Sequence, residues 1–251
     1  MIVAWLAYFD ALVAVALVLA GVVAAHFGIS TPFFGFELFA AGLLFGALAL
    51  FLAIIALLTL LFSPSRRSAL PRAAVSGVLG LIVIVPALAM VLTHPYPPIN
   101  DITTDTRNPP EFVHAQELTA NRGRSMKYDA TTYAPVQENA AAYHDLAPLK
   151  LDTPPDQAYK KAKLVAAGFP SWEITSQDPQ TRTIEGVATS SLFHFHDDFV
   201  IEVRPADGGG SLVEMRSKSR DGKGDLGANY NRIKTFFHLL QGPPSDMPPM
   251  N

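Results

Sequence analysis

Three long apolar runs, separated by short polar connections, dominate the first 93 residues of the chain. They cover about residues 8–27, 38–62 and 73–92. Each run is close to the ~20 helical residues that cross a ~30 Å hydrocarbon layer. Within residues 1–93 the formally charged side chains are Asp10, Glu37, Arg66, Arg67 and Arg72. We therefore predict that residues 1–93 form a membrane anchor of three transmembrane helices.

The two connections between these runs differ in charge. Residues 63–72 contain three arginines, whereas residues 26–37 contain no lysine or arginine. Short basic loops remain in the cytoplasm, so this difference predicts a cytoplasmic N-terminus and an external location for everything after the third span. In a bacterial cell the chain would be a multi-pass protein of the inner membrane with a periplasmic C-terminal domain. Its expected partners are the lipid bilayer and, as candidates, other membrane-protein subunits.

The region after the anchor begins with a stiff, proline-rich stretch. Residues 94–148 show little periodicity, and each proline disfavours a helix at its own position and at the residue before it. A structureless segment of this length is unusual in a compact domain, so we expect it to wrap the domain surface. Its contacts with the domain would come from Phe112, Tyr128, Tyr133 and Tyr143. The last residues, 242–251, are predicted by composition to be a disordered tail.

Residues 149–241 carry the pattern of a folded α+β domain. Strands are predicted at about residues 172–176, 181–190, 198–204 and 212–220, the last two from alternating apolar and polar residues, and a further short strand is expected at 149–151. Helices are expected at about residues 153–168 and 226–241. The predicted order is β-α-β-β-β-β-α, with the helices packed on one face of an antiparallel sheet. In the last helix the residues expected to face the sheet are Leu226, Tyr230, Ile233, Phe237 and Leu240.

Glycines between the last two strands indicate a tight hairpin at residues 207–210, because glycine tolerates the positive φ that such loops need. This hairpin would place Glu202 and Arg204 beside Glu214 and Arg216 on one face of the sheet. Cross-strand charge pairs of this kind contribute from a few tenths to about 1 kcal/mol. We interpret these four charges as structural.

Composition excludes several classes of function. Beyond Thr93 the chain carries 16 Lys and Arg against 20 Asp and Glu, so it lacks the concentrated positive charge with which proteins capture nucleic acid. We predict no nucleic-acid partner. The chain has no cysteine, which excludes disulfides, thiolate zinc sites and cysteine nucleophiles.

Several motifs in the second part of the chain occur together in a known family. They are Pro97-Pro-Ile-Asn-Asp-Ile-Thr-Thr-Asp-Thr-Arg-Asn-Pro-Pro110, Ile184-Glu-Gly-Val-Ala-Thr189, Phe195-His-Asp-Asp198, and Arg216-Ser-Lys-Ser-Arg220 with Asp225-Leu-Gly-Ala-Asn229. In this order they cover most of residues 97–241, and the chain resembles the DUF1499 family of bacterial and plastid proteins. The resemblance implies a membrane-anchored domain of unassigned biochemical function and supplies no catalytic residue. His194 and His196 lie outside the family pattern.

The stretch from His194 to Asp198 is the first candidate site. On a strand, His194 and His196 would share a face, and Asp197 or Asp198 could add oxygen ligands for a metal-dependent hydrolase. Zinc needs about three protein ligands and a supporting second shell, and no third partner is evident. We predict no metal, no cofactor and no catalytic residue here, and keep the envelope hydrolase as an alternative function.

A second candidate site precedes the last helix. Basic and hydroxyl residues there run through a glycine-rich turn into a helix N-terminus, where free N–H groups and the helix dipole attract anions. The candidate residues for a phosphate, a carboxylate or a lipid headgroup are Arg216, Ser217, Ser219, Arg220, Lys223, Asn229 and Arg232. Polar residues that could support this site are Asp101, Thr103, Asp105, Asn108, Asp197, Asp198 and Asp225. The alternative interpretation is structural: Asp225 caps the helix, and Arg216 or Arg220 holds Asp198.

Taken together, these patterns favour a membrane-anchored periplasmic domain that is not an enzyme. It would bind a ligand or serve as an accessory or assembly subunit of an inner-membrane complex. The alternatives are the metal-dependent hydrolase and a domain that binds anionic lipid headgroups.

Overall fold

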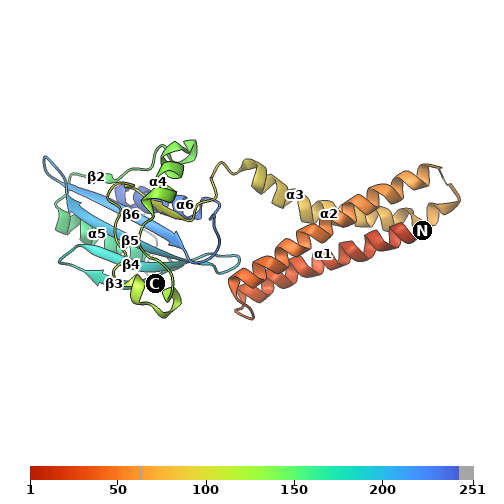
Figure 1. Ribbon diagram of the computed structural model, residues 1–251, viewed down its shortest axis with the longest axis horizontal. Coiled ribbons are helices and arrows are strands. Elements are labelled where there is room, and N and C mark those ends of the chain that lie inside the picture. The colour runs from red at the N-terminus through yellow and green to blue at the C-terminus, as the bar shows by residue number, and fades with distance from the viewer. Residues whose placement is uncertain (63, 243–251) are drawn as a thin grey trace. The chain divides into compact units, whose positions relative to one another are not determined.

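The computed structural model describes residues 1–62 and 64–242 (Figure 1). These residues form two compact units. The first consists of Met1–His94 together with Ser191–His194, and the second consists of Pro95–Ser190 and the described residues from Phe195 onward. The tail expected at residues 242–251 lies outside the described residues, apart from Gly242.

The first unit contains three long helices, α1 (Ile2–His26), α2 (Pro32–Phe62) and α3 (Leu70–Thr93), with the short 3₁₀ helix η1 (Pro64–Ala69) before α3. Three segments, Ile2–His26, Pro32–Phe62 and Arg67–Thr93, are long and apolar enough to cross a membrane, which confirms the three predicted apolar helices. The helices begin several residues before the apolar runs. Prolines in the first turns of α2 and α3 fit these helix starts, since proline lacks an N–H and the first N–H groups of a helix have no helical partner.

Small residues allow the three helices to pack closely. A Cβ on Gly21 of α1 would lie 2.4 Å from the Gly35 carbonyl oxygen of α2. A Cβ on Gly42 would meet Val18 of α1, and one on Gly46 would meet Val83 of α3. The Gly42-xxx-Gly46 pair therefore serves contacts inside this helical unit, where close backbone approach provides van der Waals packing.

The second unit is built on a single antiparallel sheet. Its order is β1-β6-β5-β4-β3, and β2 also pairs with β6. The strands are β1 (Asp101–Thr103), β2 (Leu149–Leu151), β3 (Trp172–Asp178), β4 (Thr183–Thr189), β5 (His196–Pro205) and β6 (Ser211–Ser219). The helices are α4 (Ala130–Asn139), α5 (Pro155–Ala167) and α6 (Ala228–Gln241), with short 3₁₀ helices η2 (Ala115–Glu117), η3 (Thr119–Asn121) and η4 (Ala141–Tyr143).

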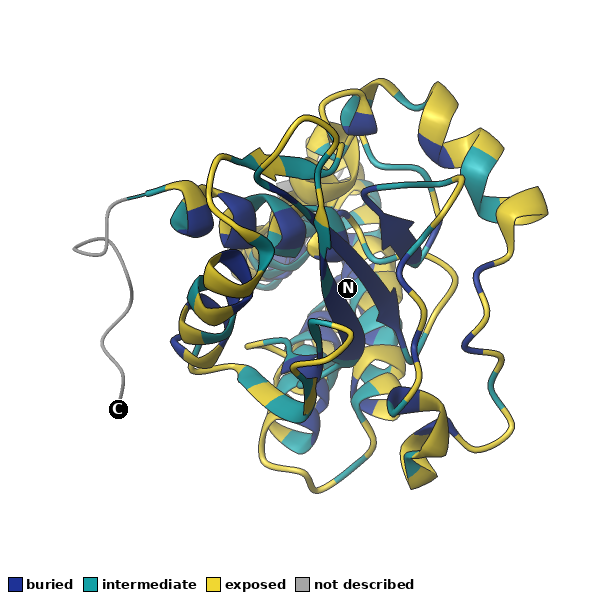
Figure 2. Ribbon diagram, turned by 90° about the vertical axis from the view of Figure 1, so that its left-hand side faces the viewer, coloured by how far each residue is buried: buried dark blue, intermediate teal, exposed yellow. Residues whose placement is uncertain are grey.

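This arrangement confirms the predicted α+β class and the order of elements from β2 to α6. The connection between β5 and β6 is a tight loop in which Gly208, Gly209 and Gly210 all have positive φ, as predicted. Alternate residues of β5 and β6, including Phe199, Ile201, Val213 and Met215, pack with α5 and α6 in the main core. Figure 2 shows the strands as the buried centre of the unit, with exposed loops around them.

The structure differs from the predictions at both ends of the domain. Helix α6 begins at Ala228, so Leu226 lies outside the helix and is exposed rather than facing the sheet. The reason is local, because Leu226 and Gly227 both have left-handed backbone conformations that a helix does not accommodate. Residues 94–148 also contain β1 and α4, which the sequence pattern did not reveal.

The segment between β1 and β2, residues 104–148, is called the wrapping segment here. Its first part covers the sheet face opposite α5 and α6, where Phe112, Ala115 and Met126 bury Val200 of β5, and its later part contributes Tyr143 to the main core. Asp129 caps α4 by accepting hydrogen bonds from the N–H groups of Thr131 and Thr132. The sheet is thus a middle layer between two helices and an irregular chain segment.

A buried ion cluster joins the wrapping segment to this sheet face. The guanidinium of Arg216 donates to both carboxylate oxygens of Asp101, at 2.8 Å each, and the Lys218 ammonium adds a third contact at 2.7 Å. Arg216 also donates to the carbonyl oxygens of Pro110 and Met126 and lies over the Phe112 ring. Asp101 and Arg216 are almost completely buried, so each charge is compensated by the other rather than by water.

Candidate functional site

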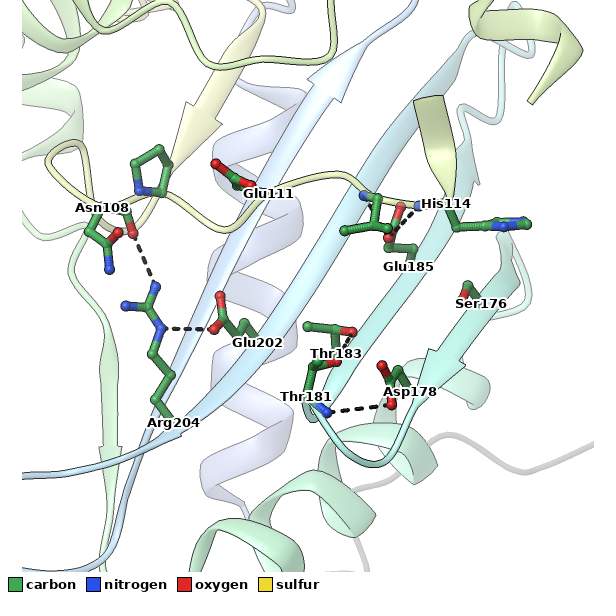
Figure 3. Close-up of a pocket in the computed structure, with 12 residues that line it drawn as sticks. Asn108, Glu111, His114, Ser176, Asp178, Thr181, Thr183, Glu185, Glu202 and Arg204 are labelled. Carbon is green, nitrogen blue, oxygen red and sulfur yellow. Dashed lines mark hydrogen bonds and ion pairs between the residues drawn. The ribbon is translucent and has the colours of Figure 1, made fainter. Parts of the chain in front are cut away.

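A cavity of about 490 Å³ opens between the wrapping segment and strands β3, β4 and β5. We call it the strand groove. It is lined by Asn108, Pro109, Glu111, Val113, His114, Ser176, Asp178, Thr181, Thr183, Glu185, Glu202 and Arg204 (Figure 3). Its volume falls within the ~300–1,000 Å³ that small-molecule sites occupy. None of these residues except Asn108 belongs to the sites proposed from the sequence.

Glu185 of β4 fixes the wall that the wrapping segment provides. Its buried carboxylate accepts hydrogen bonds from the N–H groups of Val113, His114 and Ala115, at 2.9, 2.8 and 2.7 Å. These N–H groups lie at the start of η2, where the first N–H groups of a helix have no carbonyl partner within the helix. A charged acceptor that binds three N–H groups positions this wall firmly against the strand.

Arg204 of β5 closes one end of the groove. Its guanidinium contacts Glu202 at 3.0 Å, forms an ion pair with Glu214 of β6, and donates to the Asn108 carbonyl oxygen at 3.1 Å. The Arg204–Glu214 pair bears out the predicted cross-strand pairing, whereas Glu202 contacts Arg204 within the same strand. Arg216, the fourth member of that set, has Asp101 as its partner instead.

Glu214, the second carboxylate that contacts Arg204, has a raised pKa. Burial raises its pKa to about 7, although the charge of Arg204 acts in the opposite direction. The nearby carboxylates of Asp105 and Glu202 contribute to this raised pKa, since each disfavours another negative charge. Glu214 therefore changes its charge near neutral pH.

The floor of the groove carries hydroxyl groups and one further carboxylate. The hydroxyl oxygens of Thr181 and Thr183 are 2.9 Å apart, and the Asp178 carboxylate accepts hydrogen bonds from the N–H groups of Gln180 and Thr181. These hydrogen bonds lower the pKa of Asp178 from its ordinary value, so it is ionised at neutral pH. Asp178 and Glu111 form no ion pair among the described residues.

The residues predicted to bind an anion are divided between the two faces of the sheet. Arg216 and Arg220 lie on the face of the wrapping segment, where Arg220 contacts both carboxylate oxygens of Asp198 and Arg124 provides a third contact. This arrangement agrees with the structural interpretation, in which Arg220 holds Asp198. Lys223 lies in the following turn and is exposed.

On the other face, Ser217, Ser219, Asn229 and Arg232 form a buried network with Asp197. The Ser217 hydroxyl donates to Asn229 Oδ1 at 2.7 Å, Asn229 Nδ2 donates to Ser219 Oγ at 3.0 Å, and Arg232 pairs with Asp197. Because neighbouring strand residues point to opposite faces, Arg216 and Ser217 do not reach the same ligand. The structure thus does not bring the predicted set into one ring.

The N-terminus of α6 already has an acidic cap. The Asp225 carboxylate accepts from the N–H groups of Gly227 and Asn229, at 2.9 Å each. Burial raises the pKa of Asp225. An external anion at this helix end would compete with a carboxylate of the chain itself, in a position where helix N-termini favour negative charge.

The remaining polar residues predicted as support lie in or after β1. Asp101 holds Arg216 and Lys218, as described above. The backbone of Thr103 exchanges hydrogen bonds with the side-chain amide of Gln137, at 3.1 and 2.6 Å. Asp105 accepts from the N–H groups of Arg107 and Asn108, which makes it the centre of a local turn. Of this group, only Asn108 lines the strand groove.

The structure does not place the two candidate histidines on one strand face. His194 precedes β5 and has a left-handed backbone, whereas His196 is the first residue of β5. Asp197 and Asp198 point to opposite faces and pair with different arginines. Within residues 1–62 and 64–242, no group of three or more His, Asp or Glu side chains converges as a metal site would require.

The groove could not be identified from the sequence, because its lining residues are scattered between Asn108 and Arg204. The one available signal was Glu185, a charged residue between Ile184 and Gly186 in a strand that otherwise reads as buried. A buried carboxylate needs partners, and this requirement points to donors elsewhere in the chain. The identity of those donors, three backbone N–H groups, leaves no trace in side-chain chemistry.

The raised pKa of Glu214 predicts a pH-dependent stability. Between pH 4.5, the ordinary value, and about 7, folded Glu214 keeps its proton while the unfolded chain releases it. The free energy of unfolding of the wild type should therefore fall relative to that of Glu214→Gln as pH rises through this window, and the difference should level off above it. Chemical denaturation of the full chain in detergent, followed by tryptophan fluorescence, measures this difference. A difference that is flat or rises with pH would contradict the assignment.

Comparison with known proteins places this domain in a family. The family model described as "Protein of unknown function (DUF1499)" matches residues 101–240, which is more than half of the chain. A search of curated proteins found no matching sequence. Among solved structures, the crystal structure of the di-domain ARO/CYC BexL from the BE-7585A biosynthetic pathway matches 38% of this chain at 15% identity. The match spans 43% of that chain with a TM-score of 0.29, so it supports no inference about fold or activity. On the strength of the family match, the chain belongs to the DUF1499 family.

Proposed function

We propose that this protein is a membrane-tethered, non-catalytic binding domain that holds a small ligand in the strand groove. The observation that carries the proposal is the groove itself, an open cavity of about 490 Å³ lined by polar side chains of β3, β4 and β5 and by the wrapping segment. Sites that bind small molecules are typically preformed cavities in which a few polar groups fix the orientation of the ligand.

The distribution of charged groups supports binding rather than catalysis. Asp197, Asp198 and Asp101, which are buried carboxylates, all form ion pairs with arginine. A general acid or base must reach the proton of a substrate, and side chains held in buried ion pairs do not. Along the groove, the polar groups offer hydrogen bonds and charge to a ligand that does not react.

We further propose that the domain lies outside the cytoplasm, in the periplasm of a bacterial cell, with the three helices in the inner membrane. The three apolar helices support membrane insertion, and the arginines of residues 63–72 support a cytoplasmic position for that loop. A ligand-binding domain in this position would meet solutes or partner subunits of the cell envelope.

The topology can be tested with a single introduced thiol, because the chain contains no cysteine. Asp207→Cys places a thiol in the exposed β5–β6 loop, and Ser68→Cys places one in the loop before α3. In intact spheroplasts, a membrane-impermeant maleimide should label Asp207→Cys fully and Ser68→Cys only after lysis. The reverse labelling pattern would show that the predicted orientation is wrong.

The binding role can be tested by filling the groove. Ser176→Trp introduces a large side chain into the cavity, whereas Gln177→Trp adds the same side chain at the next, exposed position of β3, outside the groove lining. Full-length protein extracted from native membranes should carry a small-molecule adduct in native mass spectrometry. Ser176→Trp should lose the adduct and Gln177→Trp should keep it. An adduct that both variants retain, or a wild type without one, would refute ligand binding in this groove.

A further inference from the structure

The lining of the strand groove has an excess of negative charge. Four carboxylates, from Glu111, Asp178, Glu185 and Glu202, face a single guanidinium, that of Arg204. Arg204 is shared between Glu202 and Glu214, so its positive charge is already balanced within the protein. The three N–H groups bound to Glu185 carry only partial charges. The groove therefore attracts cations and repels anions.

Two of these carboxylates are available to a ligand. Glu111 is exposed and has no ion pair among the described residues, and the Asp178 carboxylate accepts from the N–H groups of Gln180 and Thr181 in its own turn. A carboxylate has about four lone-pair positions, so Asp178 retains acceptor capacity after these two hydrogen bonds. The hydroxyl groups of Ser176, Thr181 and Thr183 add further acceptors along the floor.

The carboxylates are spread along the groove rather than gathered at one point. Figure 3 shows Glu111 and Glu202 toward the end closed by Arg204, and Asp178 beyond Thr181 toward the other end. No three carboxylate or imidazole side chains of the described chain converge on one position. A divalent cation requires such convergence of oxygen ligands, whereas an extended molecule with separated charges does not.

We propose that the strand groove binds an aliphatic polyamine, with one ammonium group near Glu111 and Glu202 and another near Asp178. This inference rests on the proposed ligand-binding role of the groove and specifies the chemistry of its ligand. The methylene chain of the amine would lie against Pro109 and Val113, which provide the apolar part of the wall. Ammonium groups donate three hydrogen bonds each, which matches the carboxylate and hydroxyl acceptors available.

The test measures spermidine binding to the full-length protein in a zwitterionic detergent, by isothermal titration calorimetry. Spermidine should bind at one site, and affinity should fall with added salt as exposed charges are screened. Hexane-1,6-diol, a neutral molecule with a similar methylene chain, should not bind. Glu111→Gln and Asp178→Asn should each weaken spermidine binding about fivefold, the effect of one partly exposed ion pair.

Asp207→Asn serves as the matched control, because it removes one negative charge from an exposed loop outside the groove. It should leave spermidine affinity unchanged. Equal affinities for wild type, Glu111→Gln and Asp178→Asn would overturn the proposal, as would the absence of spermidine binding. Displacement of spermidine by stoichiometric Mg²⁺ would also overturn it, in favour of an inorganic cation.

Failure of the polyamine proposal can be distinguished from failure of the proposed ligand-binding role of the groove. If Ser176→Trp removes a co-purifying molecule that is neutral or anionic, the groove binds a ligand and the polyamine assignment is wrong. If neither variant at positions 176 and 177 affects any adduct and spermidine does not bind, both the site and its ligand class are wrong.

Discussion

A carboxylate buried between two cations determines how this domain is built. Asp101 lies in the short strand β1 and holds Arg216 and Lys218 of β6 on the face of the sheet opposite the helices. Removing the charge of Asp101 would leave both Arg216 and Lys218 without a carboxylate partner in a region that excludes water, at a cost of about 3–5 kcal/mol. Because Arg216 also binds carbonyl oxygens of the wrapping segment, the ion cluster fixes that segment as well as the strand pairing.

Other polar contacts hold the wrapping segment along the rest of this face of the sheet. Glu185 binds three N–H groups of the wrapping segment, and Arg204 binds the Asn108 carbonyl oxygen. These polar contacts add to the apolar packing of Phe112, Ala115 and Met126 on Val200, whereas the main core holds α5 and α6 on the other face. Where the segment rises from the strands between these contacts, the strand groove remains open. The groove is therefore a consequence of how an irregular chain is attached to a regular sheet.

The sequence predicted the parts of the molecule that depend on periodicity. The three apolar helices, the β2-to-α6 order and the β5–β6 hairpin all follow from runs, alternation or glycine placement, and the structure has them. Strand β1 was missed because Asp-Ile-Thr contains a single apolar residue and so shows no alternation, whereas the equally short β2, Leu-Lys-Leu, does. Leu226 was assigned to the last helix on spacing alone, although the left-handed backbone at Leu226 and Gly227 prevents the helix from starting there.

The candidate sites were harder to predict, for a physical reason. Charge and hydroxyl content identified Arg216 to Asn229 as rich in potential ligand contacts, but a list of residues does not say which groups satisfy one another. In the folded chain Arg220 pairs with Asp198, Arg232 pairs with Asp197, and Asp225 caps α6. The groove, by contrast, contains residues that are unremarkable in sequence and become a site through the long-range contacts of Glu185 and Arg204.

The most direct test of this account is hydrogen exchange, measured by mass spectrometry on the full-length protein with Asp101→Asn. As a control, Asp156→Asn removes a carboxylate from an exposed pair with Arg182, for which a cost of less than about 1 kcal/mol is expected. The account predicts that Asp101→Asn greatly accelerates exchange in residues 104–128 while α5 and the β3–β4 hairpin stay protected, and that Asp156→Asn matches the wild type. Unchanged protection of residues 104–128 in Asp101→Asn would contradict the claim that this buried carboxylate holds the wrapping segment on the sheet.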